Sequence, residues 1–278
     1  ICCDGEKLQS FKHDGVMHIS QAVDAQLVEI ALKEINCMLD KPELVDRLRG
    51  KLFPESPALL DLFNQSVVPF VLQVLLGPGP VSSRHEMVQQ TSCQLALRFP
   101  GDLCPGSSPH PPVEDADKHF TQIRQSWHID GLPTDFIPGV TDHFGTIKNF
   151  DVLVGVLLSD VDEKMAGELC VYPSSHYALS EHFHSTGIDE VRKKGNSALP
   201  TGKRTDELFF RPPVHCLGKS GDVFLANYLT AHFIAPNCSS NIRHAVYFRV
   251  TSPWHPARSE QAMLQPWLHW PGLADIKL

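Results

Sequence analysis

The pattern of apolar positions in the first third of the chain predicts two helices. Over Asp24–Leu39, apolar residues at positions 27, 28, 30, 31, 35, 38 and 39 roughly follow one face of a helix. Ser20 or Asp24 can cap its start, and Lys41-Pro42 marks its end. A second, more apolar helix is expected over Ser56–Leu76, with Pro69 as a kink and a run of Gly and Pro after its end.

From about residue 88 the pattern changes to short apolar or alternating runs separated by turns, which predicts strands. The expected strands are Val88–Phe99, Asp151–Ser159, Glu168–Tyr172, Val214–Leu217, Asp222–Ala226 and His244–Thr251. Short strands of this kind favour an antiparallel sandwich or barrel. We therefore expect one α+β domain over residues 1–278, with a mainly helical part at 1–87, a β core at 88–256 and a tail at 257–278.

Three irregular stretches are expected to interrupt the core, at 100–118, 132–148 and 178–211. Loops of this length in a compact domain are usually functional lids or simply mobile. The last stretch contains six basic residues, namely Arg192, Lys193, Lys194, Lys203, Arg204 and Arg211. Such a cluster is more often a solvated surface, but it can also attract an anionic substrate.

Composition narrows the class of protein. The net charge of −8 argues against a nucleic-acid partner, and no stretch approaches the roughly 18 apolar residues of a membrane helix. The eight cysteines include no Cys-x-x-Cys pair, which favours reduced thiols in an intracellular, cytoplasmic protein. The ending Ile276-Lys277-Leu278 is close to a peroxisomal signal and leaves that compartment open. The start at Ile1, without Met, is typical of a fragment boundary.

The run Trp127-His128-Ile129-Asp130 contains the first candidate metal ligands. Two imidazoles and one carboxylate are the ligand set of a non-haem iron(II) oxygenase. At a strand end, His128 and Asp130 would share one face while Ile129 points into the core. Alone the pair is weak, because 15 His and 32 acidic residues give roughly one or two His-x-Asp/Glu pairs by chance. A polar turn explains it about as well.

A third candidate ligand and a candidate anion-binding residue follow much later in the chain. His232 lies between the apolar run Val223–Ala226 and a polar turn, and Arg243 begins the next expected strand. Such a strand–turn–strand unit can bring both side chains to one cavity. There a guanidinium can bind a carboxylate through two hydrogen bonds. Taken singly, each residue is more often structural.

Several blocks, in the same order, resemble the phytanoyl-CoA dioxygenase-like family of oxygenases. His232–Arg243 resembles the family's closing motif, in which a metal-binding histidine precedes Asn and Ser in a turn and then an arginine. Gly218–Asp222 is similar to its Gly-Asp strand entry, and Gly167–His176 to its Gly-x-Leu-x-x-x-Pro-Gly-Ser-His block. Trp127–Gly131 resembles the metal motif. The resemblance runs from about Gln94 to Val250.

The resemblance implies a double-stranded β-helix, a jelly-roll or cupin-like core, buttressed by the N-terminal helices. It implies that His128, Asp130 and His232 bind Fe(II) and form the catalytic centre. By the same resemblance, Arg243 binds the cosubstrate 2-oxoglutarate through its distal carboxylate.

Other cosubstrate contacts implied by the resemblance are Arg98, at the place of a basic residue in the family, together with Asn149 and Thr146. One departure is Ile234, two positions after the second histidine, where relatives often carry a Ser or Thr that contacts 2-oxoglutarate. His176 belongs to a structural turn in the family and is expected outside the metal centre.

The implied activity is that of a 2-oxoglutarate-dependent dioxygenase that also uses O2. It would hydroxylate a small organic substrate by ferryl hydrogen abstraction, with release of succinate and CO2. Two alternatives stay open: a cupin-type metalloenzyme that does not use 2-oxoglutarate, and a catalytically divergent jelly-roll protein that binds a metal or a ligand. A cupin-type enzyme would not need Arg243, and loss of a metal ligand would favour the divergent protein. The substrate and the oligomeric state are not indicated.

Overall fold

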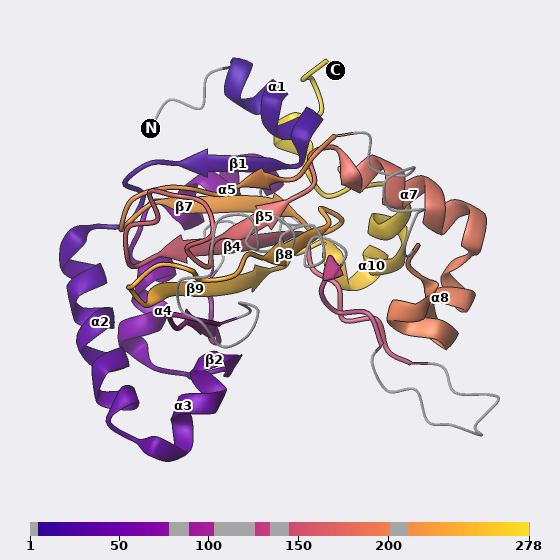
Figure 1. The fold of residues 1–278 in the computed structure, drawn as a ribbon. Helices are drawn as coiled ribbons and strands as arrows, with labels where there is room; N and C mark the ends of the chain where they lie inside the picture. Colours follow the sequence, from indigo (N-terminus) through magenta and orange to yellow (C-terminus); the bar gives the residue numbers. More distant parts are fainter. Residues whose placement is uncertain (1–4, 78–88, 103–125, 134–144, 201–210, 278) are drawn as a thin grey trace.

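The computed structural model of the chain describes residues 5–77, 89–102, 126–133, 145–200 and 211–277 (Figure 1). The α-helices are α1 (Gly5–Asp14), α2 (Ala25–Leu39), α3 (Pro42–Leu48), α4 (Pro57–Asn64), α5 (Val68–Leu76), α7 (Ser175–Thr186), α8 (Ile188–Lys194) and α10 (His255–Leu264). The strands are β1 (Val16–Ile19), β2 (Arg49–Leu52), β3 (Gln94–Arg98), β4 (Val152–Leu157), β5 (Leu169–Val171), β6 (Val214–His215), β7 (Val223–Asn227), β8 (His232–Ile234) and β9 (Arg243–Val250). Short 3-10 helices lie at Gly195–Ala198 and Pro271–Leu273.

The first predicted helix is confirmed, and the second is divided in two. The side chain of Asp24 accepts a hydrogen bond from the backbone N–H of Gln26, so Asp24 is the N-cap of α2. In place of one helix over Ser56–Leu76 there are α4 and α5, which are bent by 51°. Pro69 lies in the first turn of α5, where no N–H is needed, so it begins a helix instead of kinking one.

All strand pairings are antiparallel, and they form two sheets. The larger sheet has the order β1-β7-β4-β9-β3-β2 and the smaller one β6-β5-β8. An observed strand overlaps each of the six expected ones, although Val88 itself lies outside the described residues. β1, β2 and β8 were not predicted from the sequence; each is defined by pairing with a strand distant in the sequence, namely β7, β3 and β5.

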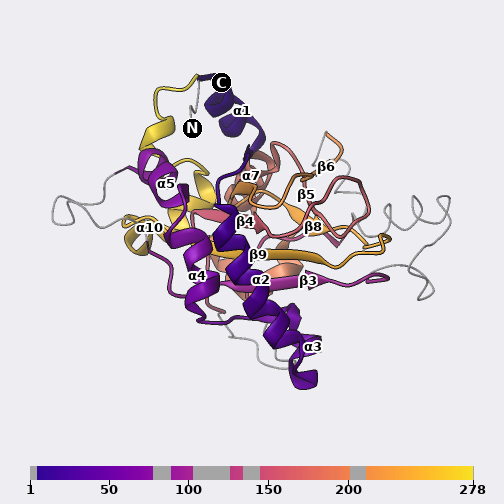
Figure 2. The same ribbon diagram turned by 90° about the vertical axis from the view of Figure 1, so that its left-hand side faces the viewer.

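The helices and the two sheets form three layers. α2, α4 and α5 cover one face of the six-stranded sheet, and the three-stranded sheet faces the other (Figure 2). Alternation along the strands separates the two interiors. On β4, Val152 and Val154 pack towards the helices, whereas Leu153 and Leu157 lie between the sheets. The layer between the sheets also contains Trp127 and Ile129 beside the first candidate ligands.

Part of the third irregular stretch is helical, which corrects the expectation for 178–198. α7, α8 and a short 3-10 helix occupy this part of the chain, at the right of Figure 1. α7 buries Leu179 and Phe183, four residues apart, and its other positions are mostly polar or small, so its apolar stripe is narrow. The other two expected loops fall largely outside the described residues.

The C-terminal residues pack on the core. Asp151, just before β4, accepts hydrogen bonds from Nδ1 of His255 at 2.9 Å and from Nδ1 of His269 at 2.7 Å. Lys12 of α1 donates to two backbone carbonyl oxygens near the chain end. These contacts fix α10 and the following residues against both α1 and the six-stranded sheet.

No single helix in the described part of the chain is long and apolar enough to cross a membrane. α4 and α5 meet the length and composition criteria only as a bent pair, and many of their apolar side chains are buried in the core.

Candidate metal and anion site

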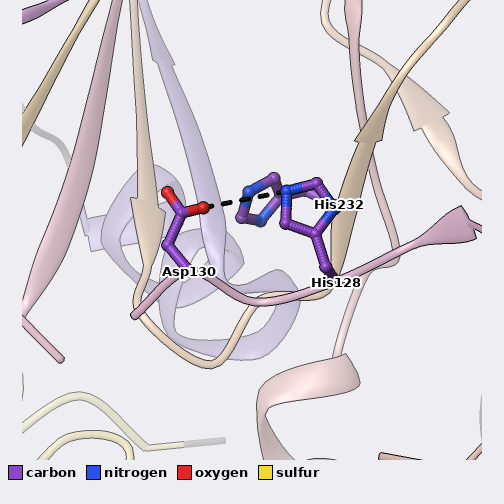
Figure 3. A group of neighbouring side chains, drawn as sticks. All are labelled: His128, Asp130 and His232. Atoms are coloured by element: carbon purple, nitrogen blue, oxygen red, sulfur yellow. Dashed lines mark ion pairs between the residues drawn. The ribbon is translucent and has the colours of Figure 1, made fainter. Parts of the chain in front are cut away.

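His128 and His232 meet across an antiparallel bridge between segments that are far apart in the sequence. The backbone N–H of His128 donates to the carbonyl oxygen of His232 at 2.9 Å, and the reverse bond measures 3.0 Å. Their ring centroids are 4.7 Å apart, and Asp130 points to the same centre (Figure 3). Ile129, which lies between His128 and Asp130 in the sequence, is 2% exposed, as strand alternation predicts. The potential ligand atoms lie within 4.8 Å of one another, so the three side chains can hold a metal ion.

Backbone carbonyls set the orientation of both rings. Nδ1 of His232 donates to the carbonyl oxygen of Thr230 at 2.9 Å, which leaves Nε2 as the lone-pair nitrogen. Nδ1 of His128 has the carbonyl oxygen of Ser126 at 3.5 Å. Burial, with a smaller contribution from His232, lowers the pKa of His128 to about 4. His128 is therefore neutral at neutral pH, as a metal ligand has to be.

Two other described clusters, around Asp151 and around Glu168, also contain three potential ligands each. In both, carboxylate oxygens lie 2.6, 2.7 and 2.9 Å from imidazole nitrogens, so these groups satisfy each other by hydrogen bonding. By contrast, Nε2 of His128 lies 3.7 Å from Oδ1 of Asp130. This separation is too long for a hydrogen bond and leaves room for an ion between the two atoms. The geometry therefore favours the His128 cluster as the metal site.

The two oxygens of Asp130 have different partners. Oδ2 accepts hydrogen bonds from Nε of Arg249 at 3.1 Å and from Nη2 at 2.7 Å, while Oδ1 faces His128. Burial raises the pKa of Asp130, but the nearby His232 and Arg249 outweigh it, and the pKa lies below its usual value. Asp130 is thus ionised and has one oxygen available for a cation.

The half-buried Arg98 and the buried Arg243 lie at paired positions of neighbouring strands. They are paired across β3 and β9, and Arg243 is 2% exposed. Within the described residues neither guanidinium forms a salt bridge. Arg243 donates to the carbonyl oxygens of Gly167 and Ala96, and Arg98 donates to other backbone oxygens. Nη2 of Arg243 and Nε of Arg98 are buried without a hydrogen-bond partner. Two cations with unused donors fit a carboxylate ligand.

A cavity of about 110 Å³ lies beside the three candidate metal ligands and Arg98. His128, Asp130 and His232 line it, and the remaining lining residues are Gln94, Ala96, Arg98, Leu153, Leu169, Ile234, Tyr247 and Arg249. Arg243 is not part of the wall, although it shares a strand face with Tyr247 and Arg249. Burial, and to a smaller extent the paired Arg243, lower the pKa of Arg98.

The structure does not bring Asn149 and Thr146 to this cavity. Nδ2 of Asn149 donates to the carbonyl oxygen of Ser259 at 2.6 Å, and its Oδ1 lies 3.2 Å from Nε2 of His255. Asn149 therefore belongs to the network that holds α10. Thr146 is exposed in the segment before β4. Ile234 does line the cavity, so the wall is apolar where relatives of the family often carry a hydroxyl.

Three polar residues of the cavity wall, Gln94, Tyr247 and Arg249, were not predicted from the sequence. Each lies an even number of positions from a predicted site residue on the same strand, namely Arg98 on β3 and Arg243 on β9. The period of two along a strand could have found them, once the site face was known.

Much of the basic cluster is paired with carboxylates. Arg192 contacts Asp189 at 2.7 Å, and Lys194 contacts Glu190 at 2.7 Å within α8. Arg211 forms an ion pair at 2.5 Å with a carboxylate of α1. Lys203 and Arg204 lie outside the described residues. An anionic substrate therefore gains little support from these charges.

The other sequence-derived candidates have structural surroundings. His176, in α7, is fully buried, and its Nε2 lies 3.2 Å from the carbonyl oxygen of Lys12. Four of the described cysteines, Cys37, Cys93, Cys170 and Cys216, are free thiols.

No protein-family model matches the sequence, and no curated protein matches it. Solved structures do match the fold. EctD from S. alaskensis, with 2-oxoglutarate and 5-hydroxyectoine, has a TM-score of 0.54 at 16% identity, covering 91% of this chain and 82% of that chain. SnoK from nogalamycin biosynthesis, a non-heme alpha ketoglutarate dependent carbocyclase, has a TM-score of 0.51 at 13% identity, covering 92% and 90%.

The epimerase SnoN, in complex with Fe3+, alpha ketoglutarate and nogalamycin RO, has a TM-score of 0.51 at 16% identity, covering 87% of this chain and 80% of that chain. Alpha ketoglutarate is another name for 2-oxoglutarate. The likeness is one of fold, because the identities are low. The chain thus shares a mixed helical and antiparallel-sheet fold with iron- and 2-oxoglutarate-dependent enzymes, and it contains a His/Asp/His cluster that can hold a metal ion.

Proposed function

We propose that the chain is an Fe(II)- and 2-oxoglutarate-dependent dioxygenase that hydroxylates a small organic molecule. Its two antiparallel sheets and its ordered sequence blocks support a jelly-roll core and placement near the phytanoyl-CoA dioxygenase-like family. One observation carries the proposal: a cluster suited to a metal ion shares a cavity wall with Arg98, which is paired with Arg243, and each of these arginines has a buried nitrogen without a hydrogen-bond partner. A dicarboxylate that also contacts the metal would bridge these two features.

The proposed roles follow from the chemistry of each side chain. His128, Asp130 and His232 hold Fe(II) and leave positions open for 2-oxoglutarate and O2. The bound iron supplies the oxygen chemistry, in which one O atom enters the substrate as a hydroxyl group and the other enters succinate, with loss of CO2. Arg243 and Arg98 bind the distal carboxylate of 2-oxoglutarate.

The apolar part of the cavity wall has a role of its own. Leu153, Leu169 and Ile234 offer no hydrogen bonds to water and lie between polar groups that do. Excluding water there strengthens the charge pairs between the guanidiniums and the cosubstrate. It also directs the oxidant to the substrate, since less water is present to compete.

The first prediction tests the metal and the cosubstrate together. Anaerobic protein with Fe(II) and 2-oxoglutarate should develop a weak visible metal-to-ligand charge-transfer band. His128→Ala should lose the band, because it removes one of three ligands. Absorption spectroscopy, with bound iron quantified in the same sample, makes the measurement. Wild-type protein that binds iron but shows no band would exclude 2-oxoglutarate as the chelating cosubstrate.

The second prediction separates this enzyme from a cupin-type metalloenzyme that does not use 2-oxoglutarate. Arg243→Ala should weaken 2-oxoglutarate binding about 10- to 100-fold, since hydrogen bonds to a charged group contribute about 1.5–3 kcal/mol. Fe(II) binding should change much less, because Arg243 does not contact the metal ligands. Titration of the charge-transfer band with 2-oxoglutarate measures the effect.

A matched control is Arg192→Ala, which removes an arginine paired with carboxylates away from the cavity. It should leave 2-oxoglutarate affinity unchanged. Equal affinity in wild type and Arg243→Ala would favour the cupin-type alternative. A catalytically divergent binding protein would bind both cofactors yet release no succinate with any candidate substrate. Screening small molecules for stimulated succinate release addresses that alternative and identifies the substrate.

A further inference from the structure

Among the described residues that line the cavity, Arg249 alone donates hydrogen bonds to the carboxylate of Asp130, the proposed metal ligand. We infer that Arg249 is a positioning residue: it holds Oδ2 of Asp130 so that Oδ1 alone is turned to the metal ion. This inference rests on the proposed function, because it takes the His128 cluster to be the metal site.

The geometry at Asp130 is that of a fork. Nε and Nη2 of Arg249 both donate to the same oxygen, Oδ2, at 3.1 and 2.7 Å. With two donors converging on it, Oδ2 points away from the imidazoles. Oδ1 is left 3.7 Å from Nε2 of His128. A carboxylate held in this way can offer a metal one oxygen but not two.

Arg249 is itself held from three sides. Its Nη2 also donates to Oε1 of Gln94 on β3, at 2.6 Å. Its guanidinium carbon lies 5.9 Å from the ring centroids of Phe53 and of Phe150. Its side chain is 30% exposed, although it carries a full charge. Gln94, Phe53 and Phe150 therefore limit the rotamers available to Arg249, and through it those of Asp130.

The consequence concerns the number of positions left at the metal. Two histidines and a one-oxygen carboxylate leave three of six positions open. A carboxylate that binds through both oxygens would fill one of these three open positions. 2-Oxoglutarate and O2 together need all three positions. By holding Oδ2, Arg249 would thus prevent Asp130 from occupying a second coordination position.

The charge of Arg249 and its hydrogen bonds to Asp130 have opposite effects on the affinity for a metal ion. A cation near the site repels a metal ion, so removing it should tighten metal binding if charge alone mattered. If positioning matters more, removal should weaken metal binding, because Asp130 loses its fixed orientation. The sign of the change therefore decides between the two effects.

The experiment compares Co(II) affinity of the whole chain without 2-oxoglutarate, followed by the visible absorption of the bound ion. We expect Arg249→Met to bind Co(II) about 10- to 100-fold more weakly, the usual effect of losing a partner of a metal ligand. Its absorption spectrum should change in shape as Asp130 binds differently. Arg249→Lys retains the charge but cannot contact Asp130 and Gln94 as a fork, so its affinity should be intermediate.

The matched control is Arg192→Met, since the Arg192 side chain is also 30% exposed and paired with a carboxylate. It should bind Co(II) like wild type. Unchanged or tighter binding by Arg249→Met overturns the inference. A further variant, His128→Ala, tests the proposed metal site independently of the role of Arg249. If it binds Co(II) normally, the metal site is wrong and the proposed function fails with it. If it loses Co(II) while Arg249→Met does not, only the inference about Arg249 fails.

Discussion

Gly131 shows how a single residue without a side chain supports the candidate metal site. It follows Asp130 directly, has a φ of +78°, and its carbonyl oxygen accepts a hydrogen bond from the N–H of Lys148 at 2.7 Å. A Cβ at this position would lie 2.2 Å from the carbonyl oxygen of Lys148. The close approach of these two backbones is possible only with glycine.

We therefore expect Gly131→Ala to destabilise the fold and to displace Asp130. Gly187→Ala is a matched control, because Gly187 also has a positive φ, +84°, but nothing lies within 4 Å of its added Cβ. The control should lose about 1–3 kcal/mol from backbone strain alone. Gly131→Ala should lose clearly more and should also bind Co(II) more weakly. Urea unfolding and Co(II) titration measure the two effects, and equal losses in both variants would contradict the role of the close contact.

At the same scale, the sequence could predict His128, Asp130 and His232 because their residue types and order carry the signal. Arg249 could not be found in this way. Its importance comes from a contact with Asp130 across a long sequence separation, and an arginine in a strand has no distinctive local pattern. Asn149 shows the reverse case: its place before β4 suggested the cavity, but its amide binds Ser259 and His255 of α10.

At the scale of elements, β3 and β9 build most of the polar wall. Their register pairs Arg98 with Arg243 and Gln94 with Tyr247, so alternate residues of both strands face one cavity. The alternating pattern in the sequence predicted these strands, because the two faces of each strand have different surroundings. One face packs towards the helices, and the other lies between the two sheets. β8, which carries His232, was not predicted from the sequence. Pairing with β5, a tertiary contact, defines that strand, and an isolated bridge joins it to His128.

The helices show the same limit. The apolar stripe and the cap at Asp24 predicted α2 almost to the residue. The break between α4 and α5 depends on Ser66, whose hydroxyl accepts a hydrogen bond from the N–H of Val68 at 3.3 Å. The sequence marked this region with the polar run Asn64-Gln65-Ser66 and with Pro69, but Pro69 was expected to kink one helix and not to begin a second. Local signals therefore predicted α2 well but did not place the boundary between α4 and α5.

At the scale of the whole molecule, the C-terminal segment closes the structure around Asp151. This carboxylate is 3% exposed and binds His255, His269 and the backbone N–H of Ser252. Burial raises the pKa of Asp151, but the hydrogen bonds from the two histidines outweigh it and hold the pKa at about 2. The sequence did not predict this network, because it joins β4 to residues that were expected to form a tail.

The depressed pKa predicts a dependence of stability on acid. In the unfolded chain this carboxyl titrates at about its ordinary value of 3.8, so its stabilising contribution is complete above that pH. The contribution is lost as the pH falls from about 4 towards about 2, and it amounts to about 2 kcal/mol. Asp151→Asn should be less stable by a similar amount at pH 7 and should lose less stability over that acid range.

Asp160→Asn is the control, because Asp160 is also hydrogen-bonded, to Lys219 and Ser220, but its side chain is 53% exposed. An exposed carboxylate with such partners contributes little, so this variant should follow wild type at every pH. Urea unfolding between about pH 2 and pH 7 measures all three proteins. Parallel losses in wild type and Asp151→Asn would place the acid sensitivity elsewhere in the molecule. A flatter profile in Asp151→Asn alone would assign it to the junction between β4 and the C-terminal helix.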